Sequence, residues 1–253
     1  MTHVETTRTG DVATISFSGE RGINVFSSDV LDALRENVES LSGDRDLRFV
    51  VLRGRGRTFV AGANIKEMID LDPDGARAFA EKGRGVFDMI ESLPQITVAA
   101  INGHALGGGC ELTLACDFRI MAARATIGQP ETHLGLIPGW GGTERLPRLI
   151  CPGPAKRLMF GGEAISADRA RQIGLVDEVV DGDEGLDQAL TCLYASLRNG
   201  APGAIARIKR VLRDGGETDQ FAACFADAES REGMGAFIDK RPASWMNEYA
   251  RHA

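Results

Sequence analysis

Two glutamates stand in glycine-rich surroundings, where a carboxylate can act as an acid or a base. Glu111 follows three consecutive glycines in INGHALGGGCELTLACD (101–117), and Glu131 lies in GQPETHLGLIPGWGGTERL (128–146). Both stretches are rich in apolar residues, and a carboxylate is costly there unless it is paired or needed for chemistry. The spacing alone leaves a second interpretation equally open, in which Glu111 caps a helix and Glu131 occupies a surface loop.

Two strand-to-helix turns offer unhindered backbone N–H groups. The segment TFVAGANIKEM (58–68) leaves a strand, passes a glycine at Gly62 and enters a helix near Asn64, and the glycines at 107–109 precede a second helix. Donors at a helix start can hold an oxyanion, because they are aimed before negative charge develops. A glycine-rich turn is more often only a turn, so this pattern indicates an oxyanion hole without establishing one.

Other chemistries fit the sequence less well. Gly103 and Gly108 have P-loop spacing, but Gly109 and Cys110 stand where lysine and serine or threonine are required. The four histidines and five cysteines show no metal-ligand spacing, and no dinucleotide fingerprint follows the first strand. A thiol nucleophile at Cys110 with His104 is conceivable, but a packed helix cysteine is favoured. We therefore expect no metal ion and no cofactor.

Composition limits the partners. The 253 residues carry a net charge of −7, with 43% hydrophobic and 26% charged residues, which is ordinary for a globular protein and argues against a general nucleic-acid binder. The cysteines are odd in number and not closely paired, which favours reduced thiols. No apolar run reaches the roughly 18 residues of a membrane span, and the first residues lack a signal sequence. A soluble, cytoplasmic protein is expected.

Strand-like and helix-like segments alternate over the first three-quarters of the chain. Strands are predicted at 12–17, 47–54, 96–103, 118–123 and 174–180, and helices at 27–41 and 76–93. This alternation predicts an α/β fold with parallel strands. From about residue 184 the pattern is helical, and NGAPG at 199–203 suggests a boundary between a core (1–198) and a helical region (199–253). That region is too small for its own core and must pack on the core or on another subunit.

Four segments carry a close resemblance to a known family. They are TFVAGANIKEM, INGHALGGGCELTLACDFRIMA, IGQPETHLGLIPGWGGTERLPRLI and ADRARQIGLVDEVV, and in this order they resemble the enoyl-CoA hydratase/isomerase (crotonase) superfamily. The resemblance covers nearly the whole chain. It implies a spiral of ββα turns, with two roughly perpendicular sheets wrapped by helices. It also implies a C-terminal helical region that builds homotrimers, often stacked into hexamers.

The resemblance also implies an activity and assigns the site. Family members bind acyl-CoA thioesters and stabilise an enolate, which places the two oxyanion donors on the N–H groups of Ala63 and Gly108. Glu111 and Glu131 match the two acids of the hydratases, Glu131 delivering the α-proton and Glu111 polarising the water, with the backbone of Gly139 close by. The expected reaction is the reversible hydration of a trans-2-enoyl-CoA to a 3-hydroxyacyl-CoA, in which coenzyme A is part of the substrate.

Several further residues are expected to meet the substrate. Asn24 and Val25 match the stretch whose backbone lines the adenine end, and Lys240 near the C-terminus is a candidate across a subunit boundary. For the basic residues an ordinary surface charge is about equally expected. The other members of the predicted substrate-binding set are Arg21, Ala61, Asn64, Ile65 and Lys66.

Two departures from the family pattern bear on specificity. The family usually has aspartate where Asn64 stands, and Asn64 is expected to cap its helix equally well. Trp140 fills a position often held by a small residue and is expected to reshape the acyl pocket. The alternatives are an enoyl-CoA isomerase, another acyl-CoA lyase or hydrolase of the same family, and a non-catalytic acyl-CoA- or RNA-binding relative. Glu131 argues against a dienoyl isomerase, in which aspartate is expected.

Overall fold

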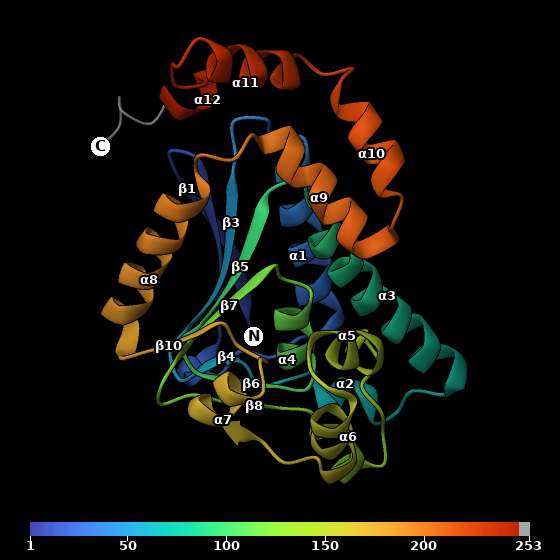
Figure 1. Ribbon diagram of the computed structural model, residues 1–253. Helices are drawn as coiled ribbons and strands as arrows, with labels where there is room; N and C mark the ends of the chain where they lie inside the picture. Colours follow the sequence, from blue (N-terminus) through green and yellow to red (C-terminus); the bar gives the residue numbers. More distant parts are fainter. Residues whose placement is uncertain (248–253) are drawn as a thin grey trace.

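A six-stranded sheet runs through the centre of the molecule (Figure 1). The computed structural model describes residues 1–247. The strand order is β1-β2-β3-β5-β7-β10, and every neighbouring pair is parallel except β1 and β2. The strands are β1 (His3–Thr9), β2 (Val12–Ser18), β3 (Phe49–Arg55), β5 (Ile96–Ile101), β7 (Phe118–Ala122) and β10 (Glu178–Val180).

A second, four-stranded sheet is built from very short strands in the order β4-β6-β8-β9. They are β4 (Thr58–Val60), β6 (His104–Leu106), β8 (Thr126–Gly128) and β9 (Ile165–Ser166). β3, β5 and β7 of the first sheet are each followed by one short strand of the second sheet and then by helix. This repeated β-β-α winding confirms the predicted spiral. It also corrects one strand: the strand predicted at 96–103 ends at Ile101 as β5, and a separate strand of the other sheet, β6, begins at His104.

Helices form where the sequence provides caps and an apolar face. Ser27 caps α1 (Ser28–Ser42) by accepting from Val30 N, and Asp72 caps α3 (Pro73–Ser92) by accepting from Gly75 N. The remaining helices of the core are α2 (Ile65–Met68), α4 (Gly108–Leu114), α5 (Gly142–Leu149), α6 (Pro152–Gly161), α7 (Ala167–Gln172) and α8 (Gly182–Leu197), with short 3₁₀ turns η1 (Glu20–Gly22) and η2 (Glu131–Leu134).

The middle strands of the six-stranded sheet, such as β3 and β5, are buried on both faces. Val50 and Leu52 of β3 belong to the main core, with residues of α1, α3 and α4. Phe49 and Val51 point the other way and pack with Leu186 and other residues of α8, which lies on the opposite side in Figure 1. Burial on both faces explains why the strand reads as an unbroken apolar run.

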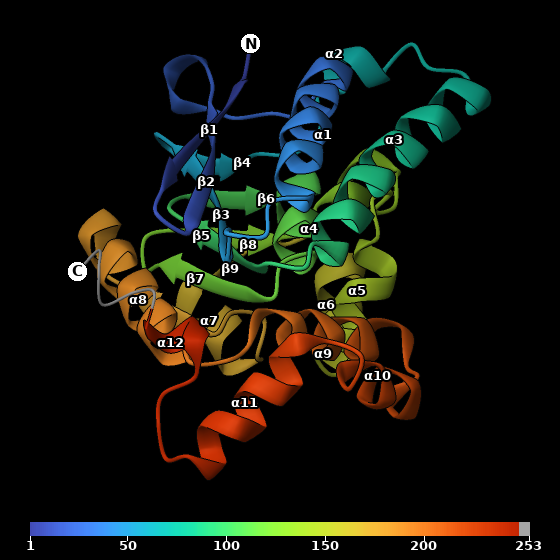
Figure 2. The ribbon, with the colours of Figure 1, turned by 90° about the horizontal axis from the view of Figure 1, so that it is seen from above.

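The last helices form an arc along one edge of the molecule in both views (Figures 1 and 2). They are α9 (Pro202–Asp214), α10 (Glu217–Cys224), α11 (Ala228–Ile238) and α12 (Ser244–Asn247). The ammonium of Lys209 holds α9 to the core by donating to Asp117 Oδ2 and to the carbonyl of Gln95, both at 2.6 Å. The helical character predicted for 199–253 is confirmed as far as residue 247, and residues 248–253 lie outside the described part. None of the helices described is long and apolar enough to cross a membrane.

Candidate active site

The predicted site residues gather at the carboxyl ends of three neighbouring parallel strands, β4, β6 and β8. Ala63 follows β4, Gly108 follows β6, and Glu131 follows β8. Ligands of parallel sheets commonly bind at this end of the strands. The spiral winding therefore brings together three segments that are far apart in the sequence.

Glycine is required in the turn after β6 for two reasons. Gly107 has φ +53°, a left-handed conformation that disfavours side chains. At Gly108, a Cβ atom would lie 2.2 Å from Cζ3 of Trp140, so the indole ring lies directly against the backbone. Gly108 is the first residue of α4, so its N–H has no acceptor within the helix. Among the described residues, no hydrogen bond occupies it.

The turn after β4 is held by the backbone of Phe26. Phe26 N donates to Gly62 O at 2.9 Å, and Asn64 N donates to Phe26 O at 2.7 Å. Ala63 lies between these two bonds, and within residues 1–247 its own N–H is not used. Asn64 occupies the N-cap position of α2, as expected, but its side chain makes no capping hydrogen bond. The two backbone hydrogen bonds to Phe26 hold this turn in place instead of a side-chain cap.

Glu111 is a buried carboxylate held by two backbone donors. Its side chain is 2% exposed, and Oε1 accepts from the N–H groups of Trp140 and Gly142, both at 2.8 Å. Burial, assisted by the charge of Glu131, raises the pKa of Glu111 from 4.5 to about 7, although the two N–H donors oppose this change. Such a pKa suits a group that exchanges protons near neutral pH.

Glu131 lies at the start of η2, opposite the two glycine turns. A Cβ atom on Gly107 would lie 3.0 Å from Glu131 Oε1 and 3.9 Å from Gly62 Cα, so this carboxylate and both turns converge. With its amide oriented to satisfy both groups, the buried Gln129 donates to the two oxygens of Glu131 at 3.0 and 3.1 Å. Burial also raises the pKa of Glu131. Gln129 also lies close to Gly142, whose N–H donates to Glu111.

The pKa of Glu111 predicts a cost to stability that depends on pH. Folding raises the pKa of Glu111 from 4.5 to about 7. Below pH 4.5 the carboxyl is protonated in both states, so its burial does not lower the free energy of unfolding. Between pH 4.5 and about 7 the free energy of unfolding falls progressively, and above about pH 7 the loss is complete. At about 1.4 kcal/mol per pKa unit, the full penalty is roughly 3 kcal/mol. We expect Glu111→Gln to match the wild type in free energy of unfolding at pH 4.5 and to exceed it above pH 7. Urea titrations across this range measure the difference, and a constant difference contradicts the assignment.

Trp140 is a buried aromatic residue of the core. Its side chain is 4% exposed and packs against Phe26, Phe79 and Phe87, with ring centroids 6.0, 5.4 and 5.6 Å away. The indole N–H donates to Phe79 O at 3.3 Å. The expectation that this residue reshapes the acyl pocket stays a prediction. The ring fills the aromatic core beneath the Gly108 turn.

The predicted coenzyme A contacts are more scattered. Asn24 is fully buried, and its side chain is engaged by Gly19 N and by the carbonyls of Thr58 and Phe59, so any ligand contact there falls to the backbone. Lys240 follows α11, a helix that lies far from α2 in both views (Figures 1 and 2), and its expected contact across a subunit boundary stays a prediction. Val25, Ala61 and Asn64 are half-buried, whereas Arg21, Ile65, Lys66 and Gly139 are exposed.

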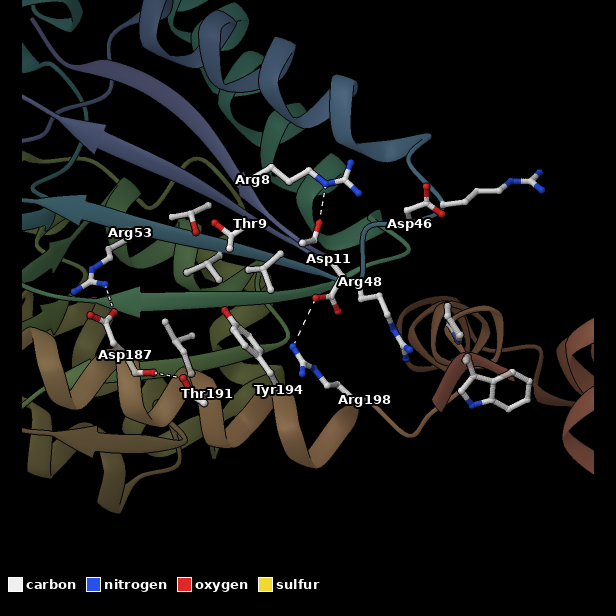
Figure 3. Close-up of a pocket in the computed structure, with 18 residues that line it drawn as sticks. Arg8, Thr9, Asp11, Asp46, Arg48, Arg53, Asp187, Thr191, Tyr194 and Arg198 are labelled. Atoms are coloured by element: carbon white, nitrogen blue, oxygen red, sulfur yellow. Dashed lines mark hydrogen bonds and ion pairs between the residues drawn. The ribbon is translucent and has the colours of Figure 1, made fainter. Parts of the chain in front are cut away.

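A cavity of about 930 Å³ lies elsewhere, between α8 and the strands β2 and β3 (Figure 3). None of the predicted site residues lines it. Its charged side chains include paired groups, such as Arg53 with Asp187 and Arg198 with Asp11. It offers no carboxylate pair beside free backbone donors, so the glutamate site remains the candidate.

Two residues of the site were not singled out from the sequence. Gln129 lies within the quoted Q-P-E segment, where a buried amide next to an acid was the available signal. Arg145, in α5, is 7% exposed and donates to Trp140 O at 3.0 Å and to Glu91 at 2.7 and 2.9 Å. Its carboxylate partner Glu91 lies 54 positions earlier in the chain, so no local spacing reveals this pair.

Comparison with known proteins agrees with the geometry. The family model "Enoyl-CoA hydratase/isomerase" matches residues 7–248. A crotonyl-CoA hydratase from Syntrophomonas wolfei is 38% identical, with 94% of this chain and 95% of the relative covered. A short-chain-enoyl-CoA hydratase from Clostridium acetobutylicum is 37% identical, with 92% and 93% covered. The crystal structure of an enoyl-CoA hydratase from Bacillus anthracis superposes with a TM-score of 0.87 at 36% identity, covering 95% of this chain and 97% of that one. The chain therefore belongs to the enoyl-CoA hydratase/isomerase family.

Proposed function

We propose that this enoyl-CoA hydratase adds water reversibly to a trans-2-enoyl-CoA through Glu111 and Glu131. The observation that carries the assignment of roles is the convergence of two carboxylates of raised pKa on two turns with unused N–H groups. Hydration needs a proton at Cα and an activated water at Cβ. Glu131 supplies the proton, and Glu111 takes part in activating the water beside Gly139.

The oxyanion hole is formed by the N–H groups of Ala63 and Gly108. As water adds at Cβ, negative charge develops on the thioester oxygen, and two fixed donors stabilise it without reorganisation. The helix start at Gly108 adds a favourable dipole. One such donor is typically worth about 3 to 4 kcal/mol of transition-state stabilisation.

Short acyl chains are the proposed substrates, and the names of two similar proteins support this choice: crotonyl-CoA hydratase and short-chain-enoyl-CoA hydratase. The test is the ultraviolet absorbance of crotonyl-CoA and longer enoyl-CoAs with purified protein, because hydration removes the conjugated chromophore. The proposed chemistry requires no metal or nicotinamide, so a chelator should leave the rate unchanged. Persistence of the chromophore with every chain length would refute the function.

The coenzyme A moiety is proposed to follow the backbone at Asn24 and Val25, with Arg21 and Lys66 near its phosphates. Both cations are exposed, as groups that meet a phosphate from solution must be. Lys240 is proposed to reach the ligand from a neighbouring subunit. These cations would let a protein of net negative charge bind the anionic coenzyme A portion of its substrate locally.

The C-terminal helices are proposed to assemble the chain into a trimer or a dimer of trimers. Large apolar side chains remain exposed on three successive helices: Ile208, Leu212, Phe221, Phe225, Met234, Phe237 and Ile238. Exposed apolar surface of this extent is typical of an interface between chains.

Light scattering should therefore report a trimer or hexamer at micromolar concentration. Phe237 is 86% exposed and Ile238 76%, so the pair Phe237→Asp and Ile238→Asp should dissociate the assembly while leaving the far-ultraviolet circular dichroism unchanged. A wild-type monomer, or an intact assembly in the double variant, would contradict the proposed interface.

A further inference from the structure

Trp140 contacts both the proposed acid Glu111 and the proposed oxyanion donor Gly108. Its backbone N–H donates to Glu111 Oε1 at 2.8 Å. Its indole ring lies against Gly108, where a Cβ atom would come within 2.2 Å of Cζ3. On the other side the ring abuts Gly83 of α3, where a Cβ atom would lie 2.3 Å from Nε1. One residue thus fixes an acid and an oxyanion donor relative to each other.

Arg145 fixes the carbonyl of the same residue. Its Nη1 donates to Trp140 O at 3.0 Å, while Nε and Nη2 bind Glu91 and Nη2 also binds Asp88. Both carboxylates belong to α3, and the two donors to Glu111 lie just before α5 and at its first residue, so the guanidinium joins α3 to this segment. A buried arginine with three acceptors has little freedom, because its planar fork matches them simultaneously.

We propose that Trp140 and Arg145 are positioning residues that hold the Glu111 carboxylate and the Gly108 N–H at the relative position that the reaction requires. This inference rests on the proposed roles of Glu111 and Gly108. Neither positioning residue contacts the reacting atoms. Arg145 acts through the carbonyl and peptide plane of Trp140, and Trp140 acts through its N–H and its ring.

The charges that bear on Glu111 can be enumerated for the residues that the structure describes. Glu131 of η2 raises its pKa, and Arg145 of α5 lowers it, whereas the other charged residues of α5, Glu144 and Arg148, are exposed. Asp88 and Glu91 of α3 lie beyond Arg145. β4 and β6, which also pack on α4, contribute only His104, an exposed side chain that faces Thr126. Loss of the Arg145 charge should therefore raise the pKa of Glu111 further.

The test uses Arg145→Met, with Arg84→Met as a matched control. Arg84 also joins α3 to α5, through Glu144 at 2.8 Å, but it touches neither Trp140 nor Glu111. We expect Arg145→Met to lower kcat for crotonyl-CoA by about 10-fold or more, with KM changed less than about 3-fold, because catalytic geometry and not substrate binding is disturbed. Arg145→Lys, which keeps the charge, should recover part of the loss.

Carbon-13 NMR of labelled glutamate side chains gives a readout independent of turnover. The pKa of Glu111 should rise in Arg145→Met, stay close to the wild-type value in Arg145→Lys, and be unchanged in Arg84→Met. A kcat and a Glu111 pKa in Arg145→Met equal to those of Arg84→Met would overturn the inference. If Arg145→Met does not fold, Trp140→Phe is the variant to test. It keeps an aromatic ring but loosens the contact with Gly108. An unaltered kcat in this variant would overturn the inference equally.

Failure of this inference is distinguishable from failure of the proposed function. If Glu111→Gln abolishes hydration while Arg145→Met resembles its control, the function stands and the positioning role falls. If Glu111→Gln hydrates crotonyl-CoA at the wild-type rate, the proposed function itself is wrong.

Discussion

Glu111→Gln and Glu131→Gln are each expected to lose at least about 10²-fold in kcat for the hydration of crotonyl-CoA, and up to about 10⁴-fold. General acid–base help is worth this much, and an amide preserves the shape of the side chain without transferring a proton. Glu111→Gln should keep the site intact, because the amide oxygen can still accept from the N–H groups of Trp140 and Gly142. KM should change little, since the coenzyme A portion binds elsewhere.

The double variant provides an internal control for this expectation. If both carboxylates act on one water and one double bond, their combined loss is smaller than the product of the single losses. Isomerisation of an enoyl-CoA needs only one base, so one single variant can retain it while hydration vanishes. Near wild-type hydration by Glu111→Gln would reject the two-carboxylate mechanism and favour the isomerase alternative.

Gly108→Ala is expected to be nearly as damaging, although it adds only one methyl group. Its Cβ would lie 2.2 Å from the Trp140 ring, which is buried and cannot move away, so the backbone must shift and carry the N–H with it. Loss of one oxyanion donor typically costs about 10²- to 10³-fold in kcat. Steady-state kinetics with crotonyl-CoA measure the loss.

Gly153→Ala is the matched control for that variant. Gly153 lies in α6, has no positive φ, and a Cβ there would meet nothing within 4 Å. We expect it to retain full activity and to be slightly more stable, because alanine restricts the unfolded chain. Equal activity in Gly108→Ala and Gly153→Ala would show that the Gly108 turn does not hold the oxyanion.

Long elements with a clear apolar period could be predicted from the sequence. α1 and α3 were expected from their spacing, and β3 from its apolar run. In the second sheet only β4 was expected, as the strand that TFVAGANIKEM leaves, and β6, β8 and β9 were missed because each has only two or three residues, too few to show an alternation. β1 was missed for another reason: it is a mostly exposed edge strand, so its sequence HVETTRT lacks an apolar face.

The candidate site was predictable where the chemistry resides in a local motif. Glu111, Glu131 and the two glycine turns stand in short segments whose composition is unusual. The residues that hold them differ in this respect. Gln129 stands only two positions before Glu131, so a local signal for it was available. Arg145 binds Glu91 and Asp88, 54 and 57 positions earlier, so its role depends on tertiary packing, which leaves no local pattern.

The donors that hold Glu111 have a consequence for the order of folding. Both come from later in the chain, 29 and 31 positions after the acid. Until the winding that contains Gly142 has docked, a carboxylate in the first turn of α4 has no backbone partner and must stay hydrated or protonated. The entropy cost of closing such loops must be met before the contacts between their ends can stabilise the fold. We therefore expect the segment around α4 to remain loosely packed in folding intermediates and to acquire slow amide exchange only after α5 is in place.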